Sequence, residues 1–379
     1  MKSVTAALAG IVLLHAVCVH AEAPVTVGVS LSTSGPAAAL GQAQRAVIDL
    51  LPGSIDGRAV RYVVLDDAAD PLLATANFAR LAGAERADVV IGSTTVPASR
   101  AMSVEAAARA TPLIAPAAAE APDGTRRWVF RTVQDDAQMA TALVAHMLDA
   151  GVRTVGFIGF ADAYGEGWRA RFGAIAEARG LRVVADERYA RLADEVDRQA
   201  GRLRTAGPDA VLIAGAGSPA MLPARALRAG GYGGALYFTP GVAQADFPQT
   251  CGAPCAGALA PAGPALVAEQ LPAGHPARAG ALVWRRAWEA AQGAAVAPPH
   301  AAHVWDAGVL LRAALPAALR QAEPGGAEFR SALREALENV REAAGAHGVF
   351  TLSANDHSGL DQRAQVMVRA VDGVWRLEP

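Results

Sequence analysis

One pattern repeats along the first two thirds of the chain: a short apolar run ends in small residues, and an alanine-rich stretch with helical spacing follows. Near-continuous apolar runs between helices are typical of parallel strands in a sheet that is covered on both faces. Eight runs fit: Val25–Leu31, Val60–Leu65, Val89–Ile91, Pro112–Ala115, Val152–Phe160, Leu181–Ala185, Ala210–Ala214 and Leu236–Phe238. The sequence therefore predicts an α/β fold.

The number of strands predicts two domains. Four runs precede the segment Trp128–Gln134 and four follow it, and two doubly wound parallel-sheet lobes fit this count better than one very wide sheet. Helices are then expected around residues 282–292, 304–320 and 329–340, and a hairpin around Asp372-Gly373 joins Val366–Val371 to Val374–Leu377. Because late helices and a hairpin follow both lobes, we expect the chain to return to each of them through a hinge.

Helix ends carry local signals as well. Asp70-Pro71 supplies an N-cap followed by proline at the first helical position. Asp135 or Asp136 begins another helix, which Gly151 ends.

The first residues resemble a secretory signal. Lys2 precedes the apolar run Val4–Val19, and Val19-His20-Ala21 has the small-x-small form of a cleavage site, so the mature chain is expected to begin near Glu22. The run is shorter than the roughly 20 residues of a membrane-spanning helix. A lipoprotein modified at Cys18 is the weaker alternative. The formal charge of −2, without basic or acidic blocks, gives no indication of nucleic-acid or membrane-surface binding.

Two cysteines remain after the predicted cleavage. Cys251 and Cys255 are close enough in sequence to form a small-loop disulfide that pins a surface excursion in an oxidising compartment. A zinc site would need further ligands, and none lies beside them.

Motifs for covalent chemistry are missing from the sequence. It contains no complete dinucleotide fingerprint, P-loop or nucleophile elbow; Gly215-Ala216-Gly217-Ser218 comes nearest to the elbow. His300 and His303 could share a helical face as metal ligands, but no third ligand lies near, so neither a metal nor a cofactor is expected.

The ends of the strands offer binding chemistry instead. In open α/β sheets, ligands lie at the carboxyl ends of the strands, where helix N-termini present free N–H groups. Hydroxyls and amides at such ends suit a carboxylate. Four of these ends are rich in small or hydroxyl residues: Ser32–Gly35, Ser93–Thr95, Pro116–Ala119 and Gly215–Ser218.

Six short motifs occur in order over nearly the whole mature chain: Thr33-Ser34-Gly35-Pro36, Leu65–Pro71, Val90-Ile91-Gly92, Val129–Thr132, Asp162-Ala163-Tyr164-Gly165 and Pro208–Val211. Together they resemble the type I periplasmic binding proteins of branched-chain amino-acid ABC transporters, the leucine/isoleucine/valine-binding family. The resemblance implies a monomeric, non-enzymatic periplasmic protein with no cofactor. Its two lobes would be joined by three crossovers, clamp a small molecule and then present it to a membrane permease.

The resemblance also implies the domain boundaries and the ligand contacts. Residues 1–21 form the signal peptide, 22–133 with 264–347 form the first lobe, and 134–263 with 348–379 form the second. The expected ligand contacts are Leu40, Thr94, Thr95, Val96, Ala117, Ala118, Ala119, Tyr164, Gly217 and Pro240.

Several of these positions depart from the amino-acid binders. Val96 replaces a Ser or Thr and Ala119 replaces a Thr, both of which meet the ligand carboxylate in the family. Pro240 replaces the acid that pairs with the ligand ammonium, and Gly217 replaces an aromatic residue, whereas Tyr164 is kept. Burying an ammonium without an anionic partner costs several kcal/mol. The ligand is therefore expected to be a small carboxylate, possibly aromatic, with a branched-chain amino acid or a sensor role in the same fold as alternatives.

Overall fold

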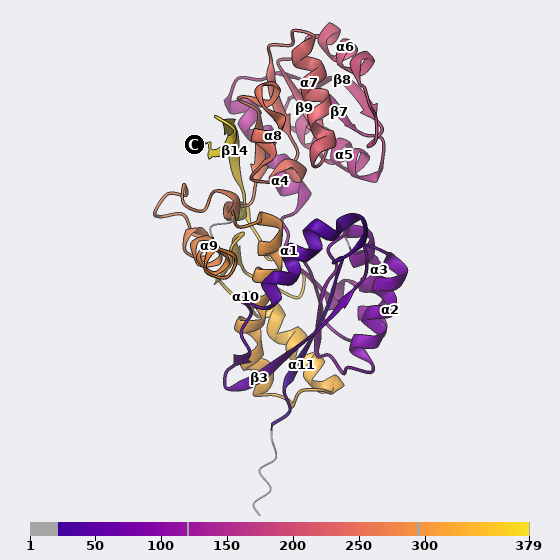
Figure 1. Cartoon of the computed structure of the whole chain (residues 1–379), viewed down its shortest axis with the longest axis vertical. Coiled ribbons are helices and arrows are strands. Elements are labelled where there is room, and N and C mark those ends of the chain that lie inside the picture. The colour runs from indigo at the N-terminus through magenta and orange to yellow at the C-terminus, as the bar shows by residue number, and fades with distance from the viewer. Residues whose placement is uncertain (1–21, 120, 294–295, 379) are drawn as a thin grey trace, which may run out of the picture.

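The computed structural model describes residues 22–119, 121–293 and 296–378. The predicted signal peptide and Cys18 lie outside these ranges. The chain forms two α/β lobes, one above the other in Figure 1, and the first sheet lies in the lower lobe. Within the described ranges, no helix has the length and apolar character needed to cross a membrane.

The first lobe is built on a six-stranded sheet with the order β2-β3-β1-β4-β5-β6. Its pairs are parallel except for β2, which runs antiparallel to β3. The strands are β1 (Val25–Leu31), β2 (Ser54–Ile55), β3 (Arg58–Asp66), β4 (Val89–Gly92), β5 (Leu113–Ala115) and β6 (Val129–Arg131).

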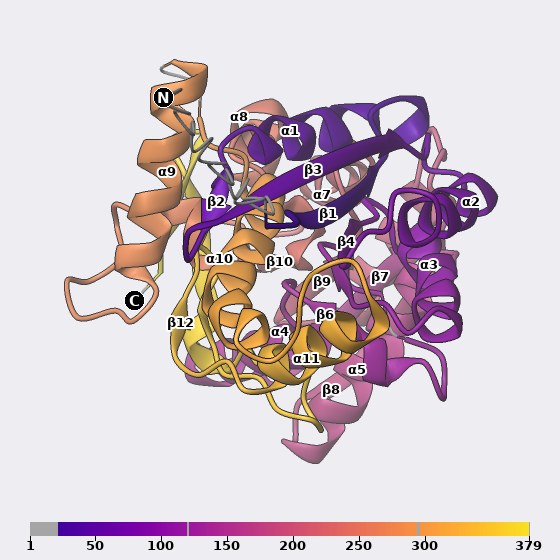
Figure 2. The ribbon, with the colours of Figure 1, turned by 90° about the horizontal axis from the view of Figure 1, so that it is seen from below.

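Helices cover both faces of this sheet, as Figure 2 shows. One face packs against α1 (Ala38–Ile48), α10 (Pro299–Leu319) and α11 (Ala327–Glu338) in a core that includes Val27, Trp284 and Leu310. The other face packs against α2 (Pro71–Ala82) and α3 (Val96–Ala108) around Phe78 and Met102.

The second lobe is built on a seven-stranded mixed sheet with the order β15-β14-β11-β10-β9-β7-β8. The strands are β7 (Thr154–Phe160), β8 (Arg182–Tyr189), β9 (Ala210–Ala214), β10 (Ala235–Phe238), β11 (Leu259–Ala262), β14 (Val366–Val371) and β15 (Val374–Leu377). Its helices are α4 (Asp136–Asp149), α5 (Ala163–Ala178), α6 (Asp197–Ala206), α7 (Met221–Ala229) and α8 (Phe247–Cys251). A separate helix, α9 (Arg278–Gln292), and a small hairpin of β12 (Ala343–Ala344) and β13 (Val349–Phe350) complete the set.

The local signals in the sequence act as predicted. Asp70 caps α2 by accepting hydrogen bonds from the amides of Leu72 and Leu73, and Asp135 caps α4. Asp372 and Gly373 both have positive φ, which is the geometry of the two-residue turn that suits a hairpin. The two-lobed α/β architecture and the C-terminal hairpin are therefore confirmed.

Five strands were not predicted: the two-residue strands β2, β12 and β13, and the longer strands β6 and β11. β6 lies within the segment that separates the two groups of predicted strands, and β11 contains Pro261, which lowers any strand prediction because proline cannot donate to a ladder. β11 lies between parallel β10 and antiparallel β14, so the second sheet is mixed rather than wholly parallel.

The chain crosses between the lobes three times, after β6, after β11 and before β14. The crossings contact one another: Gln134 Nε2 donates to the carbonyl of Ala364 at 3.0 Å. A side chain at Gly263 would overlap Gln134 and His347. Leu352 and Leu360 follow the predicted boundary at 347/348, yet they pack in the core of the first lobe. The exact boundary stays a prediction.

The disulfide between Cys251 and Cys255 is formed. Both cysteines are buried in the core cluster of the second lobe, beside Phe247 and Ala258. The pair therefore fastens core residues rather than the surface excursion that was expected.

Candidate functional site

The carboxyl ends of β1, β4 and β5 lie side by side in the first lobe. Ser30 of β1 is in register with Gly92 of β4, and Ile91 of β4 with Ile114 of β5. The loops that follow these strands are tied together, because the amide of Ser32 donates to Thr94 Oγ1 at 3.0 Å.

Thr95 and Val96 form the N-terminus of α3. Thr95 is the N-cap residue, but its side chain makes no capping hydrogen bond. Its Oγ1 atom is buried and has no hydrogen-bond partner among the described residues. Val96 follows with its side chain 45% exposed. Since a helix N-terminus presents free amides and a positive dipole end, a hydroxyl without a partner here is suited to an anion.

The other predicted residues of the first lobe differ in exposure. Leu40 lies half-buried on α1, and Ala118 is half-buried in the loop after β5, whereas Ala117 and Ala119 are almost fully buried. Ala119 lines a cavity beside β6, described below.

The second lobe brings Tyr164, Gly217 and Pro240 together. The Tyr164 hydroxyl lies 2.8 Å from Thr239 Oγ1, which in turn donates to the carbonyl of Gly215 at 3.0 Å. Gly217 donates its amide to the carbonyl of Gly241, directly after Pro240. A side chain at Gly241 would overlap Ala216 and the Tyr164 hydroxyl, so these loops pack closely.

The Tyr164 hydroxyl is consequently a structural link. Burial raises its pKa well above the ordinary value, and the hydrogen bonds with Thr239 and with the amide of Gly241 only partly oppose this. The hydroxyl therefore stays neutral and holds the loops of β7, β9 and β10 together, which leaves the ring as the part that can meet a ligand.

Carboxylates near these strand ends have partners within the protein. Asp66 accepts hydrogen bonds from Thr33, Ser34 and Ala68. Partial burial acts to raise the pKa of Asp66, but these hydrogen bonds outweigh it and lower the pKa.

Two further acids are engaged in the same way. Asp67 accepts from the hydroxyls of Ser30 and Ser32, and Asp162 caps α5 and pairs with Arg191 at 2.7 Å. Asp66, Asp67 and Asp162 are thus unsuited to hold a ligand ammonium.

Arg191 was not predicted as a site residue. It follows β8, its guanidinium lies 4.1 Å from the centroid of the Phe160 ring, and its charge acts on Tyr164. No sequence motif marks it, because its place beside Tyr164 depends on the pairing of β7 with β8.

The predicted residues thus form one group in each lobe. Among the described residues, no hydrogen bond, ion pair or ring contact joins the group of the first lobe to that of the second. The described part of the chain also contains no cluster of three or more His, Cys, Asp or Glu residues that could hold a metal ion.

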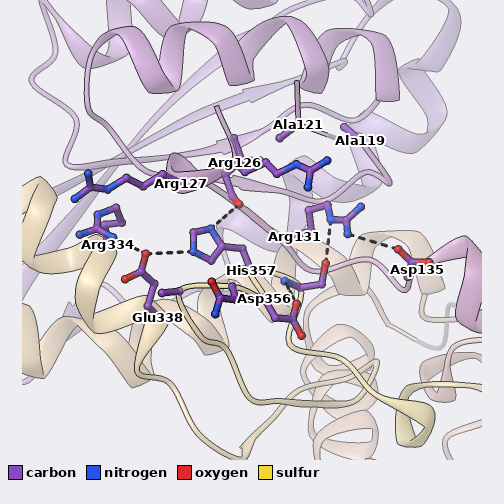
Figure 3. Close-up of a pocket in the computed structure, with 14 residues that line it drawn as sticks. Ala119, Ala121, Arg126, Arg127, Arg131, Asp135, Arg334, Glu338, Asp356 and His357 are labelled. Carbon is purple, nitrogen blue, oxygen red and sulfur yellow. Dashed lines mark hydrogen bonds and ion pairs between the residues drawn. The ribbon is translucent and has the colours of Figure 1, made fainter. Parts of the chain in front are cut away.

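A separate cavity of about 730 Å³ lies along β6, which is the edge strand of the first sheet (Figure 3). Its walls come from Ala119, from residues 121–135, from α11 and from the loop 354–358. Four arginines and three carboxylates line it: Arg126, Arg127, Arg131, Arg334, Asp135, Glu338 and Asp356.

Comparisons with known proteins agree with the two-lobed geometry. Residues 24–372 match the family model described as periplasmic binding protein. The chain is 39% identical to an extracellular ligand-binding receptor from Rhodopseudomonas palustris HaA2, with 94% of this chain and 100% of that one covered and a TM-score of 0.86. A solute-binding protein of an R. palustris ABC transporter, solved with benzoate, is 24% identical, with 94% and 95% covered and a TM-score of 0.72.

A curated relative is the chemotactic signal transduction system substrate-binding protein BasB of Halobacterium salinarum, which is 29% identical over 246 residues. That match spans 60% of this chain and 58% of the relative's length.

The chain belongs to the periplasmic binding protein family. It has the type I fold of that family, and its members are binding proteins rather than enzymes. The resemblance and fold class predicted from the sequence are confirmed.

Proposed function

We propose that this protein captures a small carboxylate between its lobes and delivers it, in the periplasm, to the membrane permease of an ABC importer. The observation that carries the proposal is Thr95 Oγ1, a buried hydroxyl with no partner among the described residues at the N-terminus of α3. A buried hydroxyl without a partner costs about 1–3 kcal/mol, which a ligand oxygen can recover.

The acids around the site favour an anion over an amino acid. Pro240 stands where an amino-acid binder has an acid, and Asp66, Asp67 and Asp162 are engaged within the protein. Asp246 is exposed at the start of α8 and makes no capping bond, so it is a candidate for pairing with an ammonium. Its substitution therefore separates the two classes of ligand.

The second lobe supplies a wall for an apolar or flat group. The Tyr164 hydroxyl lies beside Gly241, the Tyr164 ring packs near the rings of Phe160 and Trp168, and Gly217 adds no side chain. The benzoate complex of the R. palustris relative is consistent with an aromatic acid. Closure would be driven by the ligand, because contacts with both lobes form only in the closed state and so shift the population toward it.

A ligand panel tests the proposal. Mature protein is titrated calorimetrically with benzoate and other aromatic carboxylates, with leucine, isoleucine and valine, and with short amides. We expect saturable binding of a carboxylate that Asp246→Asn leaves unchanged, and recovery of the ligand unaltered. Micromolar binding of leucine that Asp246→Asn removes would refute the carboxylate assignment, and turnover of a bound compound would refute capture itself.

A sensor role is the second candidate, favoured by the similarity to a chemotactic substrate-binding protein. The ligand chemistry would be the same, and the partner would be a membrane transducer. Co-purification from membranes with a permease supports import, whereas co-purification with a transducer supports sensing.

A further inference from the structure

The cavity beside β6 is distinct from the proposed cleft. Of the predicted ligand contacts, only Ala119 lines it. The other lining residues belong to the segment between β5 and β6, to β6, to α11 and to the loop 354–358. The exception is Asp135 at the start of α4. The cavity is therefore built almost wholly on the first lobe.

The carboxylates that line the cavity have partners. Asp135 caps α4 by accepting from the amide of Ala137. Asp356 accepts from the amides of Ser358 and Gly359 at 2.9 and 3.0 Å. Glu338 is engaged by Arg334 and lies 3.2 Å from His357 Nε2. Asp135 also lies 3.7 Å from Arg131, and none of these three carboxylates forms an ion pair with Arg126 or Arg127 among the described residues.

Two arginines remain without strong partners. Arg127 makes no hydrogen bond or ion pair with any described residue. Arg126 has only a 3.8 Å approach to Asp123, and both of those side chains are largely exposed, so the approach adds little.

Two more arginines are held in place around them. Arg131 is fixed by Ser358 at 3.0 Å. Arg334 has a side chain only 6% exposed, lies over the Trp128 ring at 5.5 Å and keeps a buried Nε with no partner in the described part of the chain.

Figure 3 shows how these groups are arranged. Arg126 extends toward the side where Arg131 lies, and Arg127 extends toward the opposite side, where Arg334 lies, with His357 between the two sides. Guanidinium groups bind carboxylate and phosphate oxygens through paired hydrogen bonds. Positive charge on both sides of a cavity of about 730 Å³ suits a ligand with more than one anionic group.

We propose that this cavity is a second binding site, for a small polyvalent anion that carries two or more carboxylate or phosphate groups. Arg126 and Arg127 bind the anion at its two ends, while Arg131 and Arg334 fix the walls. Because Arg126 and Arg127 are exposed, the binding weakens as salt is added.

The test uses citrate and pyrophosphate as probes, which represent the carboxylate and the phosphate source. Calorimetric titrations at low ionic strength compare the wild-type chain with Arg126→Gln/Arg127→Gln. The matched control is Arg182→Gln/Arg198→Gln, which removes two exposed arginines of the second lobe that have no side-chain partner among the described residues. We expect saturable binding of at least one probe, weakened about tenfold or more in the first double variant and unchanged in the control.

The outcomes separate this site from the cleft. Binding that the control variant weakens equally would be a response to net charge and would overturn the proposal, as would the absence of saturable binding of both probes. If Thr95→Val loses probe binding while Arg126→Gln/Arg127→Gln keeps it, the anion binds in the cleft. That outcome would also overturn the proposal. The affinity of the cleft for a monocarboxylate should be the same in the wild type and in all the arginine variants.

Discussion

The rings of His303 and His347 stack with their centroids 4.0 Å apart where the three crossings meet. His303 Nδ1 lies 3.0 Å from the carbonyl of Thr132 in the first crossing. His347 Nε2 lies 2.7 Å from the carbonyl of Pro299, and its Nδ1 is buried with no partner in the described residues. The hinge is therefore built around two buried imidazoles, and burial disfavours a second proton on either ring.

The hinge predicts an acid-sensitive stability. Burial lowers the pKa of His300 and of His347 from 6.5 to about 4, and lowers the pKa of His303 well below 6.5. As the pH falls, these histidines are protonated in the unfolded chain before they are protonated in the folded chain. The stability that the neutral histidines contribute is therefore complete above pH 6.5 and is lost as the pH falls toward 4. Asp306 acts in the opposite direction, because burial raises its pKa to about 7, so its contribution is lost as the pH rises from 3.8 through 7.

His300→Leu isolates the histidine effect. Urea unfolding at pH 7.5 and at pH 4.5 should show that the variant loses less stability than the wild type between the two values, by on the order of 2 kcal/mol. Equal losses in the two proteins would contradict the neutral-hinge interpretation.

Thr95→Val is expected to weaken carboxylate binding without destabilising the fold. The Thr95 hydroxyl has no partner within the described chain, so its removal takes away only a ligand contact, worth about tenfold or more in affinity. The melting temperature should stay the same or rise. Thr205→Val, on the exposed face of α6, is the control. An unchanged affinity for the ligand in Thr95→Val would exclude this hydroxyl from the site.

Tyr164→Phe is expected to lower stability as well as affinity. Loss of the hydroxyl leaves the amide of Gly241 without this partner and leaves Thr239 Oγ1 with only its bond to the carbonyl of Gly215 among the described residues. Both stability and affinity should therefore fall, stability by about 1–3 kcal/mol. Tyr62→Phe removes a comparable hydrogen bond to the carbonyl of Pro52 in the first lobe and should leave affinity intact. Chemical denaturation with parallel titration separates the two effects.

Removal of the disulfide is expected to lower the free energy of unfolding only modestly. The bridge joins residues only four apart in sequence, and closure of so short a loop contributes about 2 kcal/mol through the unfolded chain. Urea unfolding of Cys251→Ala/Cys255→Ala should show a loss of this order with the fold retained. A loss of 5 kcal/mol or more would mean that packing of the sulfur atoms, rather than the cross-link, dominates.

Features encoded by neighbouring residues were predictable from the sequence. Asp70-Pro71 and Asp372-Gly373 act through hydrogen bonds and φ angles within a few residues, and each lies at the end of its element as expected. The run Ala210–Ala214 is apolar throughout and Val25–Leu31 is mostly apolar, and both are buried at every position, as expected of strands covered on both faces.

Features that depend on distant partners were not predictable. β11 exists because β10 and β14 flank it, despite Pro261. From their spacing, His300 and His303 could share a helical face as metal ligands. In the structure His303 instead stacks on His347, which lies in a different element. Arg191 lies beside Tyr164, and Arg126 and Arg127 line one cavity, only because folding brings distant parts of the chain together.

The order in which the chain emerges during its synthesis has a consequence for folding. The core of the first lobe contains Leu310 and Leu337, and the sheet of the second lobe takes its edge from Val366–Val371 and Val374–Leu377. Neither lobe can therefore be completed by the part of the chain that emerges first. Strand Val25–Leu31 must wait for residues as far along the chain as Leu310 and Leu337, which raises the contact order and slows folding. During that interval the nascent chain is the form most exposed to aggregation and most in need of a chaperone.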